Sequence, residues 1–157
     1  MNIKHLYPIA LIIIVVAISL YNLPNLINQE QPATNNVLDL SNKNLSEFPK
    51  EVLSMDQLEE LNLSNNQLTG AIPAEIKQLK NLKKLNLSHN LMTGLPAELG
   101  QLSQLEELDV SYNDLTGLPH ELDNLKNLKI LNLAGNDYSK IDLEIITKNL
   151  SDLQVIE

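Results

Sequence analysis

A single pattern of apolar and polar positions recurs along most of the chain. In its clearest copy, residues 82–92, apolar residues occupy positions 1, 4, 6 and 11 and an asparagine occupies position 9. The first copy is degenerate and the last is incomplete, and the copies start at Asn35, Leu58, Leu82, Leu105, Leu128 and Leu153. The steps between starts are 23, 24, 23, 23 and 25 residues. In-phase repeats of this length predict a solenoid in which each copy packs on its neighbours.

Within each copy, the alternation of side chains predicts a short strand followed by a turn. Leu61-Asn62-Leu63 alternates with period two, so its leucines face inward and its asparagine faces outward. Successive copies then place their strands side by side, about 4.8 Å apart, in a parallel sheet. Where the chain leaves each strand, an amide side chain can bond backbone groups of its own and neighbouring turns. These structural asparagines are Asn66, Asn90, Asn113 and Asn136.

The return leg of each copy carries a proline followed two residues later by a glutamate. Leu95-Pro96-Ala97-Glu98-Leu99 is one example, and its cognates begin at Phe48, Ile72 and Leu118. Proline at the first helical position, with a carboxylate close to free backbone amides, predicts a short helix or helical turn. Each copy is therefore expected to be a strand, an asparagine turn and a short helix on the convex side.

The charges at positions 2 and 3 provide a test of the stack. They alternate in sign as Glu59-Glu60, Lys83-Lys84 and Glu106-Glu107, and Lys129 then precedes Ile130. In an in-register stack these side chains lie next to each other and form exposed ion pairs, each worth a few tenths of a kcal/mol. An ordinary solvated surface is the alternative interpretation.

The ends of a stack expose apolar edges unless special segments cover them. Residues 137–157 depart from the repeat, because Ile141-Asp142-Leu143 lacks the proline and the return leg is more apolar. We interpret this segment as a C-terminal cap with a short last strand. Association of two chains through that open strand edge is the alternative.

The N-terminal residues differ from the repeats in composition. Residues 6–23 are almost entirely apolar, and as a helix they would extend roughly 27 Å, just enough to cross a bilayer. Lys4 before this segment favours a cytoplasmic N-terminus with the repeats on the extracytoplasmic side. The small residues Ala17 and Ser19 would also suit a cleaved signal peptide, and thus a secreted protein. Residues 1–23 are therefore read as a single-pass anchor or signal peptide, 24–36 as a polar linker and 37–157 as the repeat domain.

Composition and charge narrow the function further. The chain is 43% hydrophobic but only 3% aromatic, so the core must be aliphatic. Its formal charge is −9, which disfavours nucleic acid as a partner because phosphate backbones are repelled. There is no cysteine, and therefore no disulfide and no thiolate metal site. We predict no cofactor and no bound metal.

From about Val37 onward the chain resembles the leucine-rich-repeat family. The repeated form LxxLxLxxNxL…LPxE(I/L)xxLxxL is the 23-residue type found in bacterial and Ras-suppressor-like proteins, and residues 68–73 (Leu-Thr-Gly-Ala-Ile-Pro) look like the plant-receptor variant. The resemblance implies an α/β solenoid, a short right-handed horseshoe of five repeats plus a C-terminal stub. Its concave parallel sheet would bind proteins, peptides or glycans, and the motif says almost nothing about which ligand.

The candidate binding residues are those at positions 5, 7 and 8, which are expected to face outward on the concave sheet. His89 and Tyr112 form the expected centre, because exposed aromatic side chains are good anchors. Many of the asparagines and serines at these positions can equally serve solubility alone. The candidates are Asn62, Ser64, Asn86, Ser88, His89, Asp109, Ser111, Tyr112 and Asn132.

Catalysis is not expected, although the residue types of a catalytic triad are present. Ser88 or Ser111 could act with His89 and Asp109, but an open sheet lacks the pocket and oxyanion hole that a triad requires. We therefore expect a non-catalytic scaffold that binds a protein or peptide. The alternative is a structural or adhesive cell-surface component that acts through glycan contacts or self-association.

Overall fold

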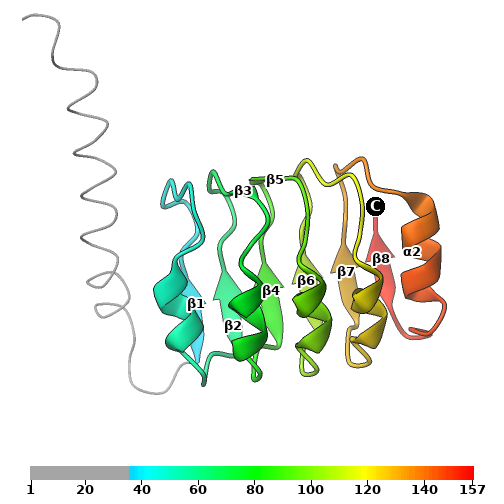
Figure 1. The fold of residues 1–157 in the computed structure, drawn as a ribbon, viewed down its shortest axis with the longest axis horizontal. Helices are drawn as coiled ribbons and strands as arrows, with labels where there is room; N and C mark the ends of the chain where they lie inside the picture. Colours follow the sequence, from blue (N-terminus) through cyan, green and yellow to red (C-terminus); the bar gives the residue numbers. More distant parts are fainter. Residues whose placement is uncertain (1–35) are drawn as a thin grey trace, which may run out of the picture. The chain divides into compact units, whose positions relative to one another are not determined.

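The strands predicted from the alternating leucines lie side by side in one parallel sheet, the main sheet (Figure 1). The computed structural model describes residues 36–157, and the expected membrane segment, residues 6–23, lies outside the described residues. No helix in the described part is long and apolar enough to cross a membrane. The strands, in order, are β1 (Val37–Asp39), β2 (Glu60–Asn62), β4 (Lys84–Asn86), β6 (Glu107–Asp109), β7 (Ile130–Asn132) and β8 (Gln154–Ile156).

The register of the main sheet is the predicted one except in the last copy. Leu61 pairs with Leu85, and Leu85 with Leu108, so equivalent positions of successive repeats are neighbours. In the last copy Leu131 pairs with Val155, so the final step is 24 residues and the predicted start at Leu153 is wrong by one residue. The reason is that no further described copy packs on this repeat. Its first position therefore does not need a leucine, and the inward side chain is Val155.

The predicted return-leg helices are short 3₁₀ helices of five residues each. Each begins one residue after the proline, which occupies the N-cap with extended backbone angles rather than the first helical position. Each places a glutamate in the first turn, as the sequence predicts. These helices form a layer opposite the main sheet (Figure 1). They are η2 (Lys50–Ser54), η3 (Ala74–Gln78), η4 (Ala97–Gln101) and η5 (His120–Asn124).

A second, two-stranded parallel sheet was not predicted. It pairs β3 (Thr69–Gly70) with β5 (Leu91–Met92) at the turns between the main sheet and the helical layer (Figure 1). The extra residue of the second copy falls in this region, and Gly70 adopts a φ of +68°, which favours glycine. The pair joins the plant-receptor-like sequence of the second copy to the 23-residue third copy, whose Leu91 N–H donates to the carbonyl oxygen of Leu68 at 2.9 Å.

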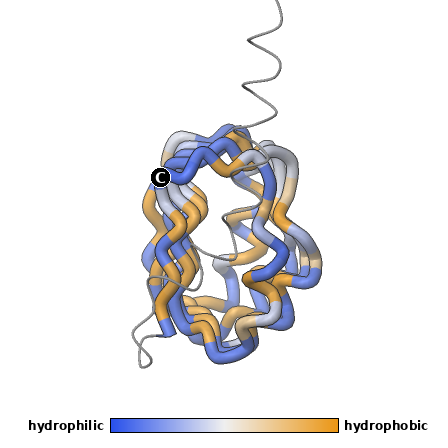
Figure 2. Tube along the Cα trace, turned by 90° about the vertical axis from the view of Figure 1, so that its left-hand side faces the viewer, coloured by the Kyte–Doolittle hydropathy of each residue, from blue (hydrophilic) through white to orange (hydrophobic). Residues whose placement is uncertain are grey.

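An aliphatic core fills the space between the main sheet and the helical layer. Figure 2 looks along the stack, where successive copies superpose and their apolar positions lie over one another. Leu61, Leu85 and Leu108 from the strands are at most 1% exposed, and Leu79 and Leu102 from the return legs are fully buried. Because equivalent leucines stack on each other, every interior copy is buried from both sides.

The asparagines at position 9 form a continuous ladder of hydrogen bonds along the stack. The Nδ2 group of Asn90 donates to the carbonyl oxygen of Leu87 in its own copy and to that of Leu63 in the preceding copy, both at 3.0 Å. Its Oδ1 accepts from the backbone N–H of Leu68 at 3.0 Å. Asn66, Asn113 and Asn136 make the equivalent bonds.

The C-terminal segment expected to act as a cap contains the α-helix α2 (Lys140–Thr147) before β8. Ser139 caps the helix by accepting a hydrogen bond from the N–H of Asp142. The carboxylate of Asp142 in turn accepts from the N–H of Leu118 at 3.2 Å and lies 3.4 Å from Nε2 of His120. These contacts, the bond from Leu118 first, lower the pKa of Asp142. The cap helix is therefore tied to the fourth return leg, and Ile146 of the same helix is fully buried.

We predict that Gly100→Ala destabilises the repeat unit. A Cβ at Gly100 would lie 2.1 Å from the carbonyl oxygen of Glu121, so η4 and η5 would have to move apart. The expected loss is about 1–3 kcal/mol in the free energy of unfolding, measured by urea denaturation. Gly94→Ala is the matched control, because a Cβ there meets open space. Equal stability of the two variants would contradict the packing described here.

We also predict that Asn90→Ala costs about 1–3 kcal/mol of stability, because it leaves buried backbone groups of two copies without partners. The exposed Asn124 at the end of η5 provides the control, and Asn124→Ala is expected to change stability by less than about 0.5 kcal/mol. Thermal or urea unfolding followed by circular dichroism measures both. A neutral Asn90→Ala would show that the ladder contributes little.

Candidate functional site

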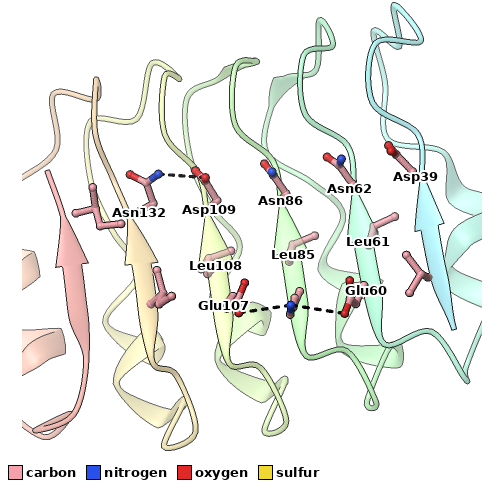
Figure 3. A pocket seen from close by; sticks show the side chains of 14 residues that line it. Asp39, Glu60, Leu61, Asn62, Leu85, Asn86, Glu107, Leu108, Asp109 and Asn132 are labelled. Carbon is pink, nitrogen blue, oxygen red and sulfur yellow. Dashed lines mark hydrogen bonds and ion pairs between the residues drawn. The ribbon is translucent and has the colours of Figure 1, made fainter. Parts of the chain in front are cut away.

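A groove of about 440 Å³ runs along the outward face of the main sheet, which we call the sheet face. All six strands of the main sheet line it, and the outward side chains come from positions 3 and 5 of each copy (Figure 3). The row at position 3 is Val37, Glu60, Lys84, Glu107 and Ile130. The row at position 5 is Asp39, Asn62, Asn86, Asp109, Asn132 and Ile156.

The position-5 side chains are held in place by the turn that follows each strand. Oδ1 of Asn62, Asn86 and Asp109 accepts a hydrogen bond from the backbone N–H two residues later, at 2.9–3.0 Å. Asn132 donates across the strands to Oδ2 of Asp109 at 3.1 Å (Figure 3). The Nδ2 groups of Asn62 and Asn86 have no hydrogen-bond partner among residues 36–157. Two oriented donors are thus available to a ligand.

The serines at position 7 do not face outward, so this part of the prediction is wrong. Ser64 and Ser88 are 6% exposed and Ser111 is 3% exposed. The hydroxyl of Ser88 donates to Oδ1 of Asn86 at 2.7 Å, and that of Ser111 donates to Oδ1 of Asp109 at 2.6 Å. The strand has ended at position 5, so the period-two rule no longer holds at position 7. Ser88 and Ser111 thus orient the position-5 side chains through their hydroxyls and backbone N–H groups, whereas Ser64 does so through its backbone N–H alone.

His89 and Tyr112 lie together, but outside the groove lining. They occupy the turns that follow β4 and β6, and their rings stack with centroids 4.4 Å apart and an interplanar angle of 11°. Tyr112 is 55% exposed. Both residues have left-handed backbone angles, with φ of +53° and +52°. A bulky residue rarely adopts this conformation, which costs about 1 kcal/mol or more.

A glycine in the next copy makes room for the ring of Tyr112. A Cβ at Gly135 would lie 2.7 Å from Cδ1 of Tyr112, so the tyrosine ring rests against the bare backbone. Gly135 was not among the predicted site residues, although its place one repeat after Tyr112 could have identified it. The stacked pair is therefore a built ledge at the carboxyl ends of the strands.

The charged residues predicted to pair across the strands do so. Nζ of Lys83 lies 2.6 Å from Glu59, and Nζ of Lys129 lies 2.6 Å from Glu106. The hydrogen bond from each lysine lowers the pKa of the glutamate that accepts it. The adjacent Lys84 is shared between two glutamates in the groove, as described below.

The position-3 residues were treated as structural charges in the sequence analysis and missed as groove residues. Positions 3 and 5 flank the buried position 4, so the period-two alternation already places them on one face. Applying that rule to the whole strand would have identified Glu60, Lys84, Glu107 and Ile130.

The structure does not assemble the residue types of the triad. The hydroxyls of Ser88 and Ser111 donate to position-5 side chains, and His89 stacks on Tyr112. Within residues 36–157, no three acidic or histidine side chains lie close enough to hold a metal ion. The arrangement offers oriented hydrogen-bond donors, charges and an aromatic ledge, which are means of binding.

Solved structures of several repeat proteins are similar to this chain, whereas no curated protein matches it. A leucine-rich-repeat protein of Leptospira interrogans, LIC12759, is 43% identical with a TM-score of 0.67, and the match covers 71% of this chain and 28% of that one. The ectodomain of the receptor kinase SOBIR1 from Arabidopsis thaliana is 32% identical with a TM-score of 0.63. The match covers 76% of this chain and 65% of the ectodomain.

The plant peptide hormone receptor RGFR1, solved in complex with RGF2, is 37% identical with a TM-score of 0.66, and the match covers 76% of this chain and 20% of that receptor. This chain therefore spans less than two thirds of each of these three proteins. The family model described as a leucine-rich repeat region matches residues 36–157, the whole of the part that the structure describes. The chain belongs to the leucine-rich-repeat family.

Proposed function

We propose that this protein is a non-catalytic binding module that takes a protein or peptide ligand on the sheet face. The observation that carries the proposal is the groove, which is open to solvent along all six strands and is lined by side chains that the fold holds in fixed positions. The Nδ2 groups of Asn62 and Asn86, which have no partner within residues 36–157, suit the carbonyl oxygens of an extended peptide. A peptide backbone offers such acceptors at regular intervals.

The ledge of His89 and Tyr112 supports the same proposal. Exposed aromatic side chains provide large contact area at a small cost in side-chain entropy. A strained backbone that persists is typical of functional positions. In our proposal the ligand contacts Asn62, Asn86, Asp109 and Asn132 in the groove and extends over the ledge, while Ser64, Ser88 and Ser111 act only by orienting the side chains above them.

Similarity to receptor proteins adds support. RGFR1 was solved with RGF2. PEPR1 was solved with AtPEP1, and it is 35% identical in a match that covers 70% of this chain and 16% of PEPR1. SOBIR1 contributes the ectodomain of a receptor kinase. We therefore propose that the repeat domain of this chain recognises its ligand outside the cytoplasm.

We predict that groove variants lose ligand binding without unfolding. Phage-displayed random peptides selected on the full chain supply the ligands, and fluorescence anisotropy measures their affinity. Asn86→Arg places a bulky side chain in the middle of the groove, and the double variant His89→Ala/Tyr112→Ala removes the ledge. Each is expected to weaken binding by about tenfold or more. The bound peptides should be recovered intact, because no cleavage is expected.

Gln78→Arg is the matched control, because Gln78 is an exposed residue at the end of η3 in the opposite layer. Its affinity should equal that of the native chain, and circular dichroism should show all variants folded. If Asn86→Arg and the ledge variant both bind as tightly as Gln78→Arg, or if the selection yields no groove-dependent peptide, the proposal is wrong.

We also propose that residues 6–23 keep the protein in a membrane, that residues 24–36 form a polar linker, and that the repeats lie on the extracytoplasmic side. We predict that native protein sediments with membranes and that mass spectrometry finds an uncleaved N-terminus. Protease added to intact cells or spheroplasts should then digest the repeats. A soluble product that begins shortly after Ser19 would instead establish cleavage of a signal peptide and secretion.

A further inference from the structure

The groove has an uneven distribution of charge along the stack. From β1 to β6 its lining contains the carboxylates of Asp39, Glu60, Glu107 and Asp109 but a single ammonium group, that of Lys84. This part of the groove therefore carries a formal charge of −3. The remaining strands β7 and β8 contribute the apolar side chains of Ile130 and Ile156, of which Ile156 is 38% exposed.

Lys84 shows how a cation fits between the two glutamates. Its Nζ lies 3.7 Å from Oε1 of Glu60 on one side and 3.6 Å from Oε1 of Glu107 on the other (Figure 3). The neighbouring pairs, Lys83 with Glu59 and Lys129 with Glu106, are closer, at 2.6 Å, and each lysine has one glutamate. One shared ammonium leaves two carboxylates undercompensated, and all three side chains are between 42% and 46% exposed. They are accessible to a second cation.

From these observations we propose that the groove takes an extended peptide segment in which a lysine or arginine is followed or preceded, about four residues away, by an aliphatic residue. The basic side chain binds Glu60 and Glu107, and the aliphatic side chain contacts Ile130 and Ile156. This inference rests on the proposed function and specifies the class of ligand.

The spacing follows from the geometry of the sheet. The centre of the glutamate pair lies at β4, and the apolar spot lies two to three strands further along, at β7 and β8. With strands about 4.8 Å apart, the separation is about 10–14 Å. An extended chain advances about 3.4 Å per residue and places alternate side chains on one face. A separation of four residues therefore spans this distance and keeps both side chains directed at the groove.

A second copy of this protein fits the groove less well than a basic peptide. Residues 36–157 contain 19 acidic residues and 10 lysines, so another copy would bring further negative charge. A cationic segment instead meets an opposite potential, which accelerates association and favours the correct partner.

The test uses peptides selected from a random library on the full chain. Their affinity for the native chain is compared with their affinity for the double variant Glu60→Gln/Glu107→Gln. We expect the selected peptides to carry a net positive charge and a basic and an aliphatic residue about four positions apart. The double variant, whose groove keeps its shape but has a charge of −1, should bind them about tenfold more weakly. Affinity should also fall as salt rises, because exposed charges are screened.

The matched control is Glu75→Gln/Glu121→Gln, which removes two exposed carboxylates from the helical layer and should leave affinity unchanged. A variant of the apolar spot, Ile130→Ser, should weaken binding of peptides that contain the aliphatic residue and have no effect on peptides in which it is replaced by serine. Equal effects on both peptides would contradict the assigned contact.

The outcomes separate this inference from the proposed function. If the selected peptides are acidic or neutral, and if Asn86→Arg weakens their binding but Glu60→Gln/Glu107→Gln does not, the inference is wrong and the proposal of groove binding stands. Peptides insensitive to every groove variant would overturn both. Analytical ultracentrifugation of the same samples tests the other occupant: a dimer that Glu60→Gln/Glu107→Gln dissociates would show that a second copy fills the groove.

Discussion

The buried asparagine at position 9 is the interaction on which the rest of this structure depends. Each amide joins two copies, because Asn90 donates to carbonyl oxygens of its own turn and of the preceding one and accepts from a backbone N–H. The chain makes a sharp turn there, where backbone groups lack ladder partners and burial would otherwise cost about 1–3 kcal/mol for each. The chain contains no cysteine, so disulfides contribute nothing to this stack. Leucine packing holds neighbouring copies together, whereas the amide ladder fixes the register between one copy and the next.

The fixed register of the strands determines which side chains lie next to each other on the sheet face. Because Glu60, Lys84 and Glu107 come from successive copies, they meet only when the strands pair as they do here. A parallel sheet with one repeat per strand displays its outward residues at a constant interval, so each copy can vary two side chains without changing the fold. The core positions are nearly identical in every copy, while positions 3 and 5 differ. That difference is where specificity can be encoded.

The main architecture could be predicted from the sequence because it depends on local patterns that are repeated. The strands, the asparagine turns, the short helices and the charge pairs all follow from side-chain period and spacing. The β3–β5 pair was not predicted, because residues 69–70 and 91–92 lie beyond the alternating stretch from which the strands were inferred. The shift at Leu153 was missed for another reason: a leucine is required at position 1 only when another copy covers it. In the candidate site, the buried Ser64, Ser88 and Ser111 were misassigned because a strand rule was applied beyond the strand's end.

Position 8 departs from the rest of the repeat in two copies, at His89 and Tyr112. Each of the first five copies has a left-handed residue there, and Asn42, Asn65 and Gly135 are types that accept this conformation readily. Tyr112 is not such a type. Its ring stacks on that of His89 and rests against Gly135. If solubility or turn formation alone decided these positions, asparagine would serve at lower cost in both. In our proposal, the two aromatic residues occupy these positions because of what they present to a ligand.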